Sequence, residues 1–250
     1  VAANIDTVFL MMGLDADYSL RRMERYLSTA YEGGASPVVV LNKADLCSDV
    51  PVRVAEVESA SGGAPVVAIS TKLDEQLEAL ARFIAPGRTI ALLGSSGVGK
   101  STLVNRLVGH QLQRTRAVRE ADQTGRHTTT HRQLIPLPGG GLLIDTPGMR
   151  ELQLWDGGAG VGAAFDDVES FAAGCRFRDC RHESEPGCAV KAAVAAGSLE
   201  ARRLDSYRDL RREQDSLAQR QDERALAEKK RQGKILGRAI KNFYKLKKKS

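Results

Sequence analysis

A glycine-rich stretch near the middle of the chain has the residue types that hold phosphate. It fits the pattern G-x-x-x-x-G-K-S/T and reads Gly94-Ser95-Ser96-Gly97-Val98-Gly99-Lys100-Ser101-Thr102. The backbone N–H groups of such a loop, with the positive end of the following helix, point at phosphate oxygens. We expect Lys100 to reach the β- and γ-phosphates and the Ser101 hydroxyl to bind Mg²⁺. An apolar run before the loop and a helical pattern after it disfavour a chance Gly/Ser-rich turn.

A second phosphate-site element follows downstream, where the apolar run 142–144 leads into Asp145-Thr146-Pro147-Gly148. Asp145 can hold Mg²⁺ through a water, and the Gly148 N–H can meet the γ-phosphate because no side chain blocks the approach. Alone, these four residues fit a β-turn. Together with the phosphate loop they predict a nucleotide-sensing switch.

A base-recognition element, Asn42-Lys43-Ala44-Asp45, ends the apolar run 37–41. The Asp45 carboxylate can accept two hydrogen bonds from guanine, whereas adenine offers no such donor pair. Lys43 can lay its alkyl stem against the ring, and Asn42 can tie the base loop to the phosphate loop. Ser70, with the next two residues, could offer backbone N–H groups to the guanine O6. A plain strand-ending turn is the alternative, and the phosphate loop weakens it.

A cluster of soft metal ligands lies in the last third of the chain and reads Cys175-x4-Cys180-x-His182-x5-Cys188. Three thiolates and one imidazole suit a closed, tetrahedral, structural Zn²⁺ site. The polar segment between them is too short to form a core, so metal would supply its stability. A disulfide pair with a spare thiol is the alternative. Cys47 stands apart and is expected to be an ordinary thiol.

The elements that must position these residues alternate between apolar runs and helical periods. Runs expected to be strands cover residues 37–41, 64–69, 89–93 and 142–144, after a first apolar segment at 7–12; helix-like stretches cover 20–31, 73–84 and 100–108. This alternation predicts an α/β fold, mostly a parallel sheet with helices on both faces. Residues 114–131 are expected to form a loop, residues 157–162 a glycine-rich linker, and residues from 199 to about 232 a helix.

Composition bounds the class of protein. The 250 residues are 42% hydrophobic and 27% charged, typical of a soluble globular chain, which excludes disordered and collagen-like classes. The longest apolar stretch, residues 8–14, is far below the ~20 residues that span a bilayer. No basic segment precedes it, so no signal peptide is expected. Clustered thiols without a secretion signal point to the cytoplasm.

Charge separates the chain into two parts. The net charge is +6, yet residues 201–250 alone hold 17 basic and 7 acidic side chains. Lys and Arg neutralise phosphates, and Phe243 and Tyr244 can stack on bases, which favours a nucleic-acid partner. A solvated tail without a partner and an anionic membrane surface are the alternatives. We expect two domains, residues 1–156 and 157–250.

The order of the motifs is that of a circular permutation, because the base element precedes the phosphate loop, which precedes the switch. In this order, and in the segments 42–45, 94–102, 125–130, 145–151, 154–156 and 175–188, the chain resembles the circularly permuted, ribosome small-subunit-dependent GTPases (RsgA). Members of that family normally carry an OB-fold domain ahead of the GTPase domain. This sequence is expected to begin just after that domain would end.

The resemblance implies a GTP hydrolase that assists late maturation of the 30S subunit and is stimulated by it. It implies GTP or GDP, Mg²⁺ and one structural Zn²⁺ as cofactors, with 30S and its rRNA as partners. We expect a cytoplasmic monomer without membrane contact. The remaining readings are an RNA-binding adaptor with a structural nucleotide site, a permuted GTPase acting on another ribosomal particle, and an ATP-using enzyme, which Asp45 disfavours.

Catalysis needs a group that orients the attacking water. Met149 stands where Ras-like enzymes have glutamine and cannot hold water. His127 is the best candidate, and the resemblance points to the same residue; a merely solvated histidine is the alternative. A hydroxyl among residues 128–130 should complete the Mg²⁺ sphere, and Thr129 is slightly favoured over Thr128.

Overall fold

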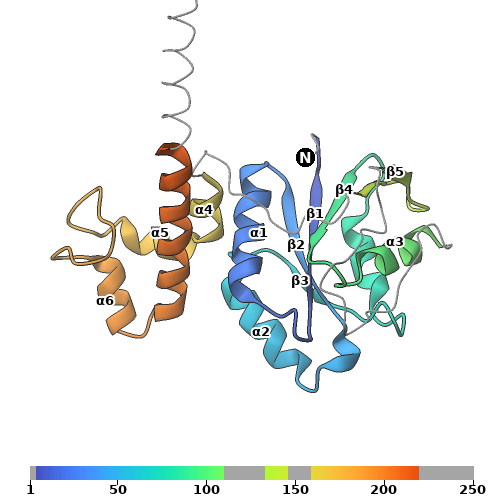
Figure 1. Ribbon diagram of the computed structural model, residues 1–250, viewed down its shortest axis with the longest axis horizontal. Helices are drawn as coiled ribbons and strands as arrows, with labels where there is room; N and C mark the ends of the chain where they lie inside the picture. The colour runs from blue at the N-terminus through green and yellow to red at the C-terminus, as the bar shows by residue number, and fades with distance from the viewer. Residues whose placement is uncertain (1–3, 110–132, 146–158, 220–250) are drawn as a thin grey trace, which may run out of the picture.

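The fold is a six-stranded sheet with helices on both faces, in a computed structural model that describes residues 4–109, 133–145 and 159–219 (Figure 1). The strands are β1 (Thr7–Gly13), β2 (Ser36–Asn42), β3 (Val66–Ala68), β4 (Thr89–Gly94), β5 (Gln133–Pro136) and β6 (Leu142–Asp145). The helices are α1 (Leu20–Glu32), α2 (Val50–Ala60), α3 (Lys100–Val108), α4 (Ala159–Ala164), α5 (Asp166–Ala172) and α6 (Ala189–Ala195), with 3-10 turns η1 (Ala44–Leu46) and η2 (Leu77–Phe83). Residues 201–219 form a further helix.

The sheet has the strand order β3-β2-β1-β4-β6-β5, and every neighbouring pair is parallel except β5 with β6. The expected mostly parallel α/β sheet is therefore confirmed. Gly13 pairs with Asn42, and Met11 pairs with Gly94, so β1, β2 and β4 end at the same edge. That edge receives the base element and the phosphate loop side by side.

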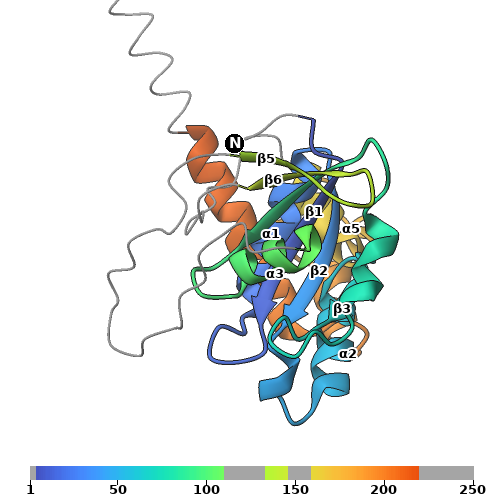
Figure 2. The same cartoon turned by 90° about the vertical axis from the view of Figure 1, so that its right-hand side faces the viewer.

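The side chains of β1 point alternately to the two faces of the sheet, and the buried residues form two cores, one on each face. Val8, Leu10 and Met12 pack on the side of α1 and α2, whereas Phe9 and Met11 pack on the side of α3 and η2. Successive side chains of a strand point to opposite faces, so a strand covered on both sides must be apolar throughout. Figure 2, which views the molecule from the α3 side, shows that helix in front of the sheet.

Helices α2, α5 and α6 and strand β5 were not predicted, and one element was predicted with the wrong type. Helix α2 was not expected, and four of its 11 residues are β-branched valines and one is a proline, types that disfavour a helix. Pro51 is tolerated because it stands in the first turn, and burial of Val57 holds the helix. The edge strand β5 was also not expected. The helix expected at 73–84 is the 3-10 turn η2, which starts after Gln76 in the left-handed conformation (φ 59°).

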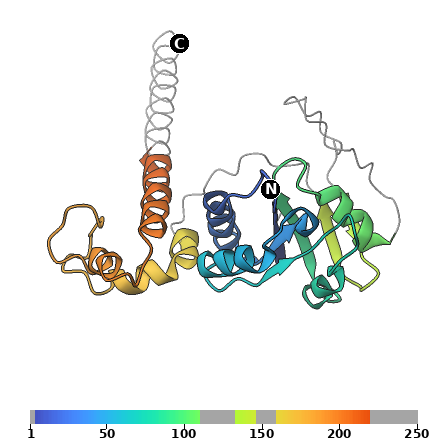
Figure 3. The ribbon, with the colours of Figure 1, turned by 90° about the horizontal axis from the view of Figure 1, so that it is seen from below.

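The linker expected at residues 157–162 is wrong for its described part. Helix α4 begins at Ala159 and its Val161 is fully buried. A Cβ on Gly160 would lie 2.1 Å from the carbonyl oxygen of Ser28 in α1, so glycine permits the close approach of the two helices. Figure 3 shows α4 to α6 and the 201–219 helix beyond α1, on the side away from the sheet. The loop expected at 114–131 lies outside the described residues.

A buried arginine connects these C-terminal helices to the sheet domain. The side chain of Arg203, 7% exposed, donates to Glu24 Oε1 of α1 at 2.9 Å and, through two nitrogens, to both oxygens of Asp167 in α5. It also donates to the carbonyl oxygens of Ala60 and Ala164, at the ends of α2 and α4. Its guanidinium carbon lies 4.0 Å from the ring centroid of Phe165. One side chain thus contacts four helices.

Among the described residues, none of the helices has the length and apolar character that crossing a membrane requires.

Replacing Arg203 with alanine is expected to lower the free energy of unfolding by about 3–5 kcal/mol, because Glu24 would remain buried without its partner. Arg202→Ala is the matched control, since that side chain is 52% exposed and its ion pairs are worth about 0–1 kcal/mol. Urea denaturation followed by circular dichroism measures both. Equal losses for the two variants would contradict this role of Arg203.

Candidate nucleotide and zinc sites

The phosphate loop joins β4 to α3 and keeps the N-terminus of that helix open. Gly99 stands at the N-cap position with φ 105°, and no side chain caps the helix within the described residues. A Cβ on Gly99 would lie 2.2 Å from Asn42 Nδ2, so only glycine lets the loop touch the base element. Ser101 and Thr102 lie in the first turn of α3, where backbone N–H groups have no partner within the helix.

The Asn42 side chain ties three segments together. Its Nδ2 donates to the carbonyl oxygen of Val98 at 2.7 Å and to Thr71 Oγ1 at 3.1 Å, while its Oδ1 accepts from Thr71 N at 3.0 Å. The residue is 1% exposed, so these bonds satisfy a buried amide. The end of β2, the loop after β3 and the phosphate loop are thereby fixed relative to one another.

Two groups in the phosphate loop fit a bound anion. Lys100 Nζ donates to the carbonyl oxygens of Gly94 and Ser95 at 2.7 and 2.6 Å, which keeps the ammonium at the loop. The Ser95 hydroxyl is buried and has no hydrogen-bond partner among the described residues. Such a buried polar atom is costly unless something binds it. The donors present therefore fit nucleotide phosphates.

The base end of the site is held by two side-chain contacts. Asp45 Oδ1 accepts from Ser70 Oγ at 2.7 Å, and Lys43 Nζ pairs with Asp15 Oδ2 at 2.6 Å. The backbone N–H of Ser70 donates to Glu75, and that of Thr71 donates to Asn42. Of the three N–H groups expected to face the guanine O6, that of Lys72 alone makes no such bond to another described residue.

Other predicted site residues are placed only in part. Asp145 is the last residue of β6, and its neighbour Ile144 pairs with Ala91 of β4, so β6 ends beside the strand that leads into the phosphate loop. His127, Thr129 and Gly148 lie outside the described residues. Their roles stay predictions.

The four expected zinc ligands come together. The ligand atoms of Cys175, Cys180, His182 and Cys188 all lie within 4.8 Å of one another. Cys175 Sγ lies 3.6 Å from His182 Nδ1 and 3.9 Å from Cys188 Sγ, and Cys188 Sγ lies 3.4 Å from His182 Nδ1. A tetrahedral ion with Zn–S bonds of about 2.3 Å separates its sulfurs by about 3.8 Å. The cluster is compatible with one structural zinc ion, and its cysteines are free thiols.

The surroundings of the cluster favour metal-ligating protonation states at two of its members. Burial lowers the pKa of His182, which keeps the imidazole neutral. Burial opposes ionisation of Cys175, but backbone N–H groups of Val190 and Ala189 lower the pKa of its thiol. Burial and the two neighbouring thiols raise the pKa of Cys180 to about 11, so that thiol loses its proton only when a cation binds.

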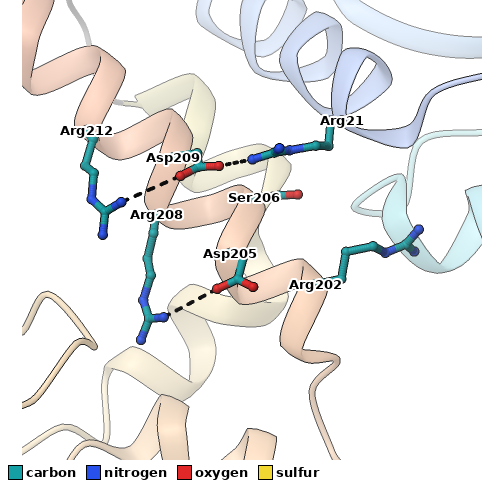
Figure 4. Close-up of a pocket in the computed structure, with 7 residues that line it drawn as sticks. All are labelled: Arg21, Arg202, Asp205, Ser206, Arg208, Asp209 and Arg212. Atoms are coloured by element: carbon teal, nitrogen blue, oxygen red, sulfur yellow. Dashed lines mark hydrogen bonds and ion pairs between the residues drawn. The ribbon is translucent and has the colours of Figure 1, made fainter.

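A shallow groove lies between α1 and the 201–219 helix and shares no residue with either site (Figure 4). It is lined by Arg21, Arg202, Asp205, Ser206, Arg208, Asp209 and Arg212. Asp209 pairs with Arg21 and with Arg212, and Asp205 pairs with Arg208 at 3.5 Å. The Arg21–Asp209 pair joins the helix to α1 at the surface, whereas the other two pairs lie along the helix itself, so the groove is a feature of the packing of the two helices.

Asp15, which binds the Lys43 ammonium, was not predicted as a residue of the base site. Thr71 was expected there only for its backbone N–H, yet its hydroxyl also accepts a hydrogen bond from Asn42. Both follow strands that end at the same edge of the sheet, and that position is the one signal in the sequence that marks them.

The chain matches known proteins over most of its length. Residues 1–155 match the family model described as RsgA GTPase. A Lactiplantibacillus plantarum protein named "Small ribosomal subunit biogenesis GTPase RsgA 2" is 46% identical over 246 residues, covering 98% of this chain and 69% of that protein. An Opitutus terrae protein named "Small ribosomal subunit biogenesis GTPase RsgA" is 54% identical over 223 residues, covering 89% of this chain and 61% of that protein.

Two crystal structures share the fold. YjeQ from Thermotoga maritima is 29% identical with a TM-score of 0.65, covering 84% of this chain and 72% of that one. YloQ, described as a circularly permuted GTPase, is 28% identical with a TM-score of 0.63, covering 85% of this chain and 69% of that one. This chain therefore spans roughly two thirds of the length of its relatives.

Removing zinc is expected to unfold the segment 175–188 and leave the sheet intact, because metal replaces burial there. Metal analysis should find one zinc per chain, and chelation or Cys188→Ser should expose this segment to protease. Cys47→Ser, at a thiol outside the cluster, is the control and should keep the metal. A chelated protein that is cleaved no faster than the metal-bound one would reject the assignment.

Proposed function

The chain belongs to the RsgA GTPase family, and from that premise we propose that it hydrolyses GTP to assist late maturation of the small ribosomal subunit, which stimulates the reaction. The observation that carries the proposal is the Asn42 side chain, which bonds the base loop to the phosphate loop at Val98. A nucleotide that contacts both the base loop and the phosphate loop would bind to loops whose separation the Asn42 side chain already fixes.

Guanine selection would fall to Asp45, with Lys43 against the ring plane. The Asp45 carboxylate has one oxygen oriented by Ser70, so the carboxylate is held in place to accept from the guanine N1–H and 2-amino groups. The phosphates would take the backbone N–H groups of the glycine-rich loop and the N-terminus of α3, with Lys100 moving from its carbonyl partners to the β- and γ-phosphates.

Magnesium, when bound, would neutralise charge on the β- and γ-phosphate oxygens during transfer. The residues proposed to hold it are Ser101 at the start of α3 and Asp145 at the end of β6, with Thr129 completing the sphere. Strand β6, which ends at Asp145, is the neighbour in the sheet of β4, the strand that leads through the phosphate loop to Ser101.

The attacking water would be oriented by His127, because Met149 has no group that can hold water. A neutral imidazole can accept a hydrogen bond from water near pH 7. The proposed consequence is slow turnover in the free protein and faster turnover when the subunit positions His127.

The proposed partner is the 30S subunit with its rRNA, and the relatives' names support it because they state small ribosomal subunit biogenesis. Ten basic side chains in residues 229–250, without an acidic one, would neutralise RNA phosphates. We propose that residues 1–156 carry the nucleotide chemistry and 157–250 the zinc and RNA contacts. The protein would act as a cytoplasmic monomer without membrane contact.

Replacing Asp45 with asparagine should weaken GTP binding about 10- to 100-fold, because a charge-assisted pair of hydrogen bonds is lost. Xanthosine triphosphate carries an oxygen in place of the 2-amino group and should bind the variant better than the original protein. Fluorescent nucleotide titration measures both, with the exposed Asp49→Asn as a control. Unchanged GTP preference in Asp45→Asn would contradict guanine selection by this carboxylate.

GTP turnover should rise on adding purified 30S subunits, because the docked subunit is proposed to position His127. His127→Ala should reduce the stimulated rate by about 100-fold or more while leaving GTP affinity unchanged. Phosphate release with and without subunits measures both rates. Flat turnover with intact RNA binding would favour the adaptor, and an unaffected His127→Ala rate would remove this residue from catalysis.

A further inference from the structure

An acidic residue of the β1–α1 connection reaches into the base site. Asp15 Oδ2 lies 2.6 Å from Lys43 Nζ, and the two side chains are 29% and 21% exposed. Lys43 is the residue whose stem is proposed to lie against guanine. The ion pair therefore restricts the positions that the alkyl stem of Lys43 can take.

The connection is built to hold this carboxylate in one orientation. Asp15 Oδ1 accepts from Asp17 N at 3.1 Å, and Asp17 Oδ2 accepts from Gly13 N at 3.2 Å. Arg22, in the first turn of α1, donates to Asp17 Oδ1 at 2.8 Å. Since one oxygen of Asp15 is bound by its own loop, the other is left facing Lys43.

The space for the carboxylate comes from a residue without a side chain. A Cβ on Gly13 would lie 2.4 Å from Asp15 Oδ1, so any larger residue would displace the carboxylate. Gly13 pairs with Asn42 at the ends of β1 and β2, and Leu14 N donates to the Asn42 carbonyl oxygen at 2.8 Å. The Asp15 loop is thus fastened to the residue that precedes Lys43.

The backbone of Lys43 is also fixed. It has φ 65°, in the left-handed region, between the buried Asn42 and Asp45, which is bound by Ser70. Partial burial opposes ionisation of Asp15, yet the hydrogen bond from Lys43 lowers the pKa of Asp15 below its usual value. The Asp15 carboxylate is therefore charged at neutral pH, and a charge-assisted hydrogen bond to it holds the end of the long Lys43 side chain.

We infer that Asp15 is a positioning residue of the base site, holding the Lys43 ammonium so that the alkyl stem lies against the face of the guanine. This inference rests on the proposed function. Fixing both ends of the stem before the nucleotide arrives removes rotamer freedom that binding would otherwise have to restrict. The pair acts on the base alone, so GDP and GTP should depend on it equally.

Asp15→Ala is expected to weaken the binding of GDP and of GTP by the same factor, about 5- to 20-fold, while turnover at saturating GTP stays unchanged. The nucleotide affinity of Asp15→Asn should lie between those of the wild-type protein and Asp15→Ala, because the amide oxygen can still accept a hydrogen bond from Lys43. Fluorescent GDP titration gives the affinities. The control is Asp49→Ala, which removes the same charge from an exposed carboxylate at the start of α2.

A double-mutant cycle separates positioning from a general loss of structure. In a Lys43→Ala background, Asp15→Ala should have no further effect, because its partner is gone. Gly13→Ala should reproduce the Asp15→Ala effect without changing any charge. The inference would be overturned if the losses of nucleotide affinity in Asp15→Ala and Lys43→Ala were fully additive, or if Asp15→Ala bound nucleotide as tightly as Asp49→Ala. A wild-type protein that binds no guanine nucleotide would instead overturn the proposed function on which the inference rests.

Discussion

The Asn42 side chain is the contact on which the arrangement of the site depends. It is buried, and its amide makes three hydrogen bonds, two to Thr71 and one to Val98, in two segments that are distant in sequence. In a low-dielectric interior an amide that loses such partners is strongly penalised, so the three loops are held at one separation. The spacing between base recognition and phosphate binding therefore follows from a single residue. Permuting the chain order leaves this contact intact, because the strand order of the sheet brings the loops to one edge, where Asn42 joins them.

Much of the fold could be predicted, because apolar runs that must be buried on both faces are visible in the sequence. Helix α3 and strand β2 appear within a residue of the expected bounds. The exceptions have physical causes. Val-rich α2 has poor intrinsic helix propensity and is held by burial of one face, which only tertiary contacts reveal. Residues around Gly160 have a linker's composition, but the glycine serves close packing on α1.

The site could be predicted where motif residues act through their own chemistry. The four zinc ligands converge as their spacing indicates, and the phosphate loop lies between β4 and α3. Contacts between motifs were harder to foresee. Nothing in the spacing of Asp15 or Thr71 reveals that they meet Lys43 and Asn42, because the strand order of the sheet brings them together.

The Arg203 cluster has an evolutionary consequence. A guanidinium buried against Glu24 cannot be exchanged alone, because the Glu24 carboxylate, 5% exposed, would be left as an uncompensated ion in the interior, whereas Asp167 is 40% exposed and can be solvated. Homologous chains should therefore substitute positions 24 and 203 together, passing from a charged pair to an uncharged one in few steps. Since position 24 is in α1 and position 203 is in the 201–219 helix, this co-variation would link the histories of the two halves of the chain.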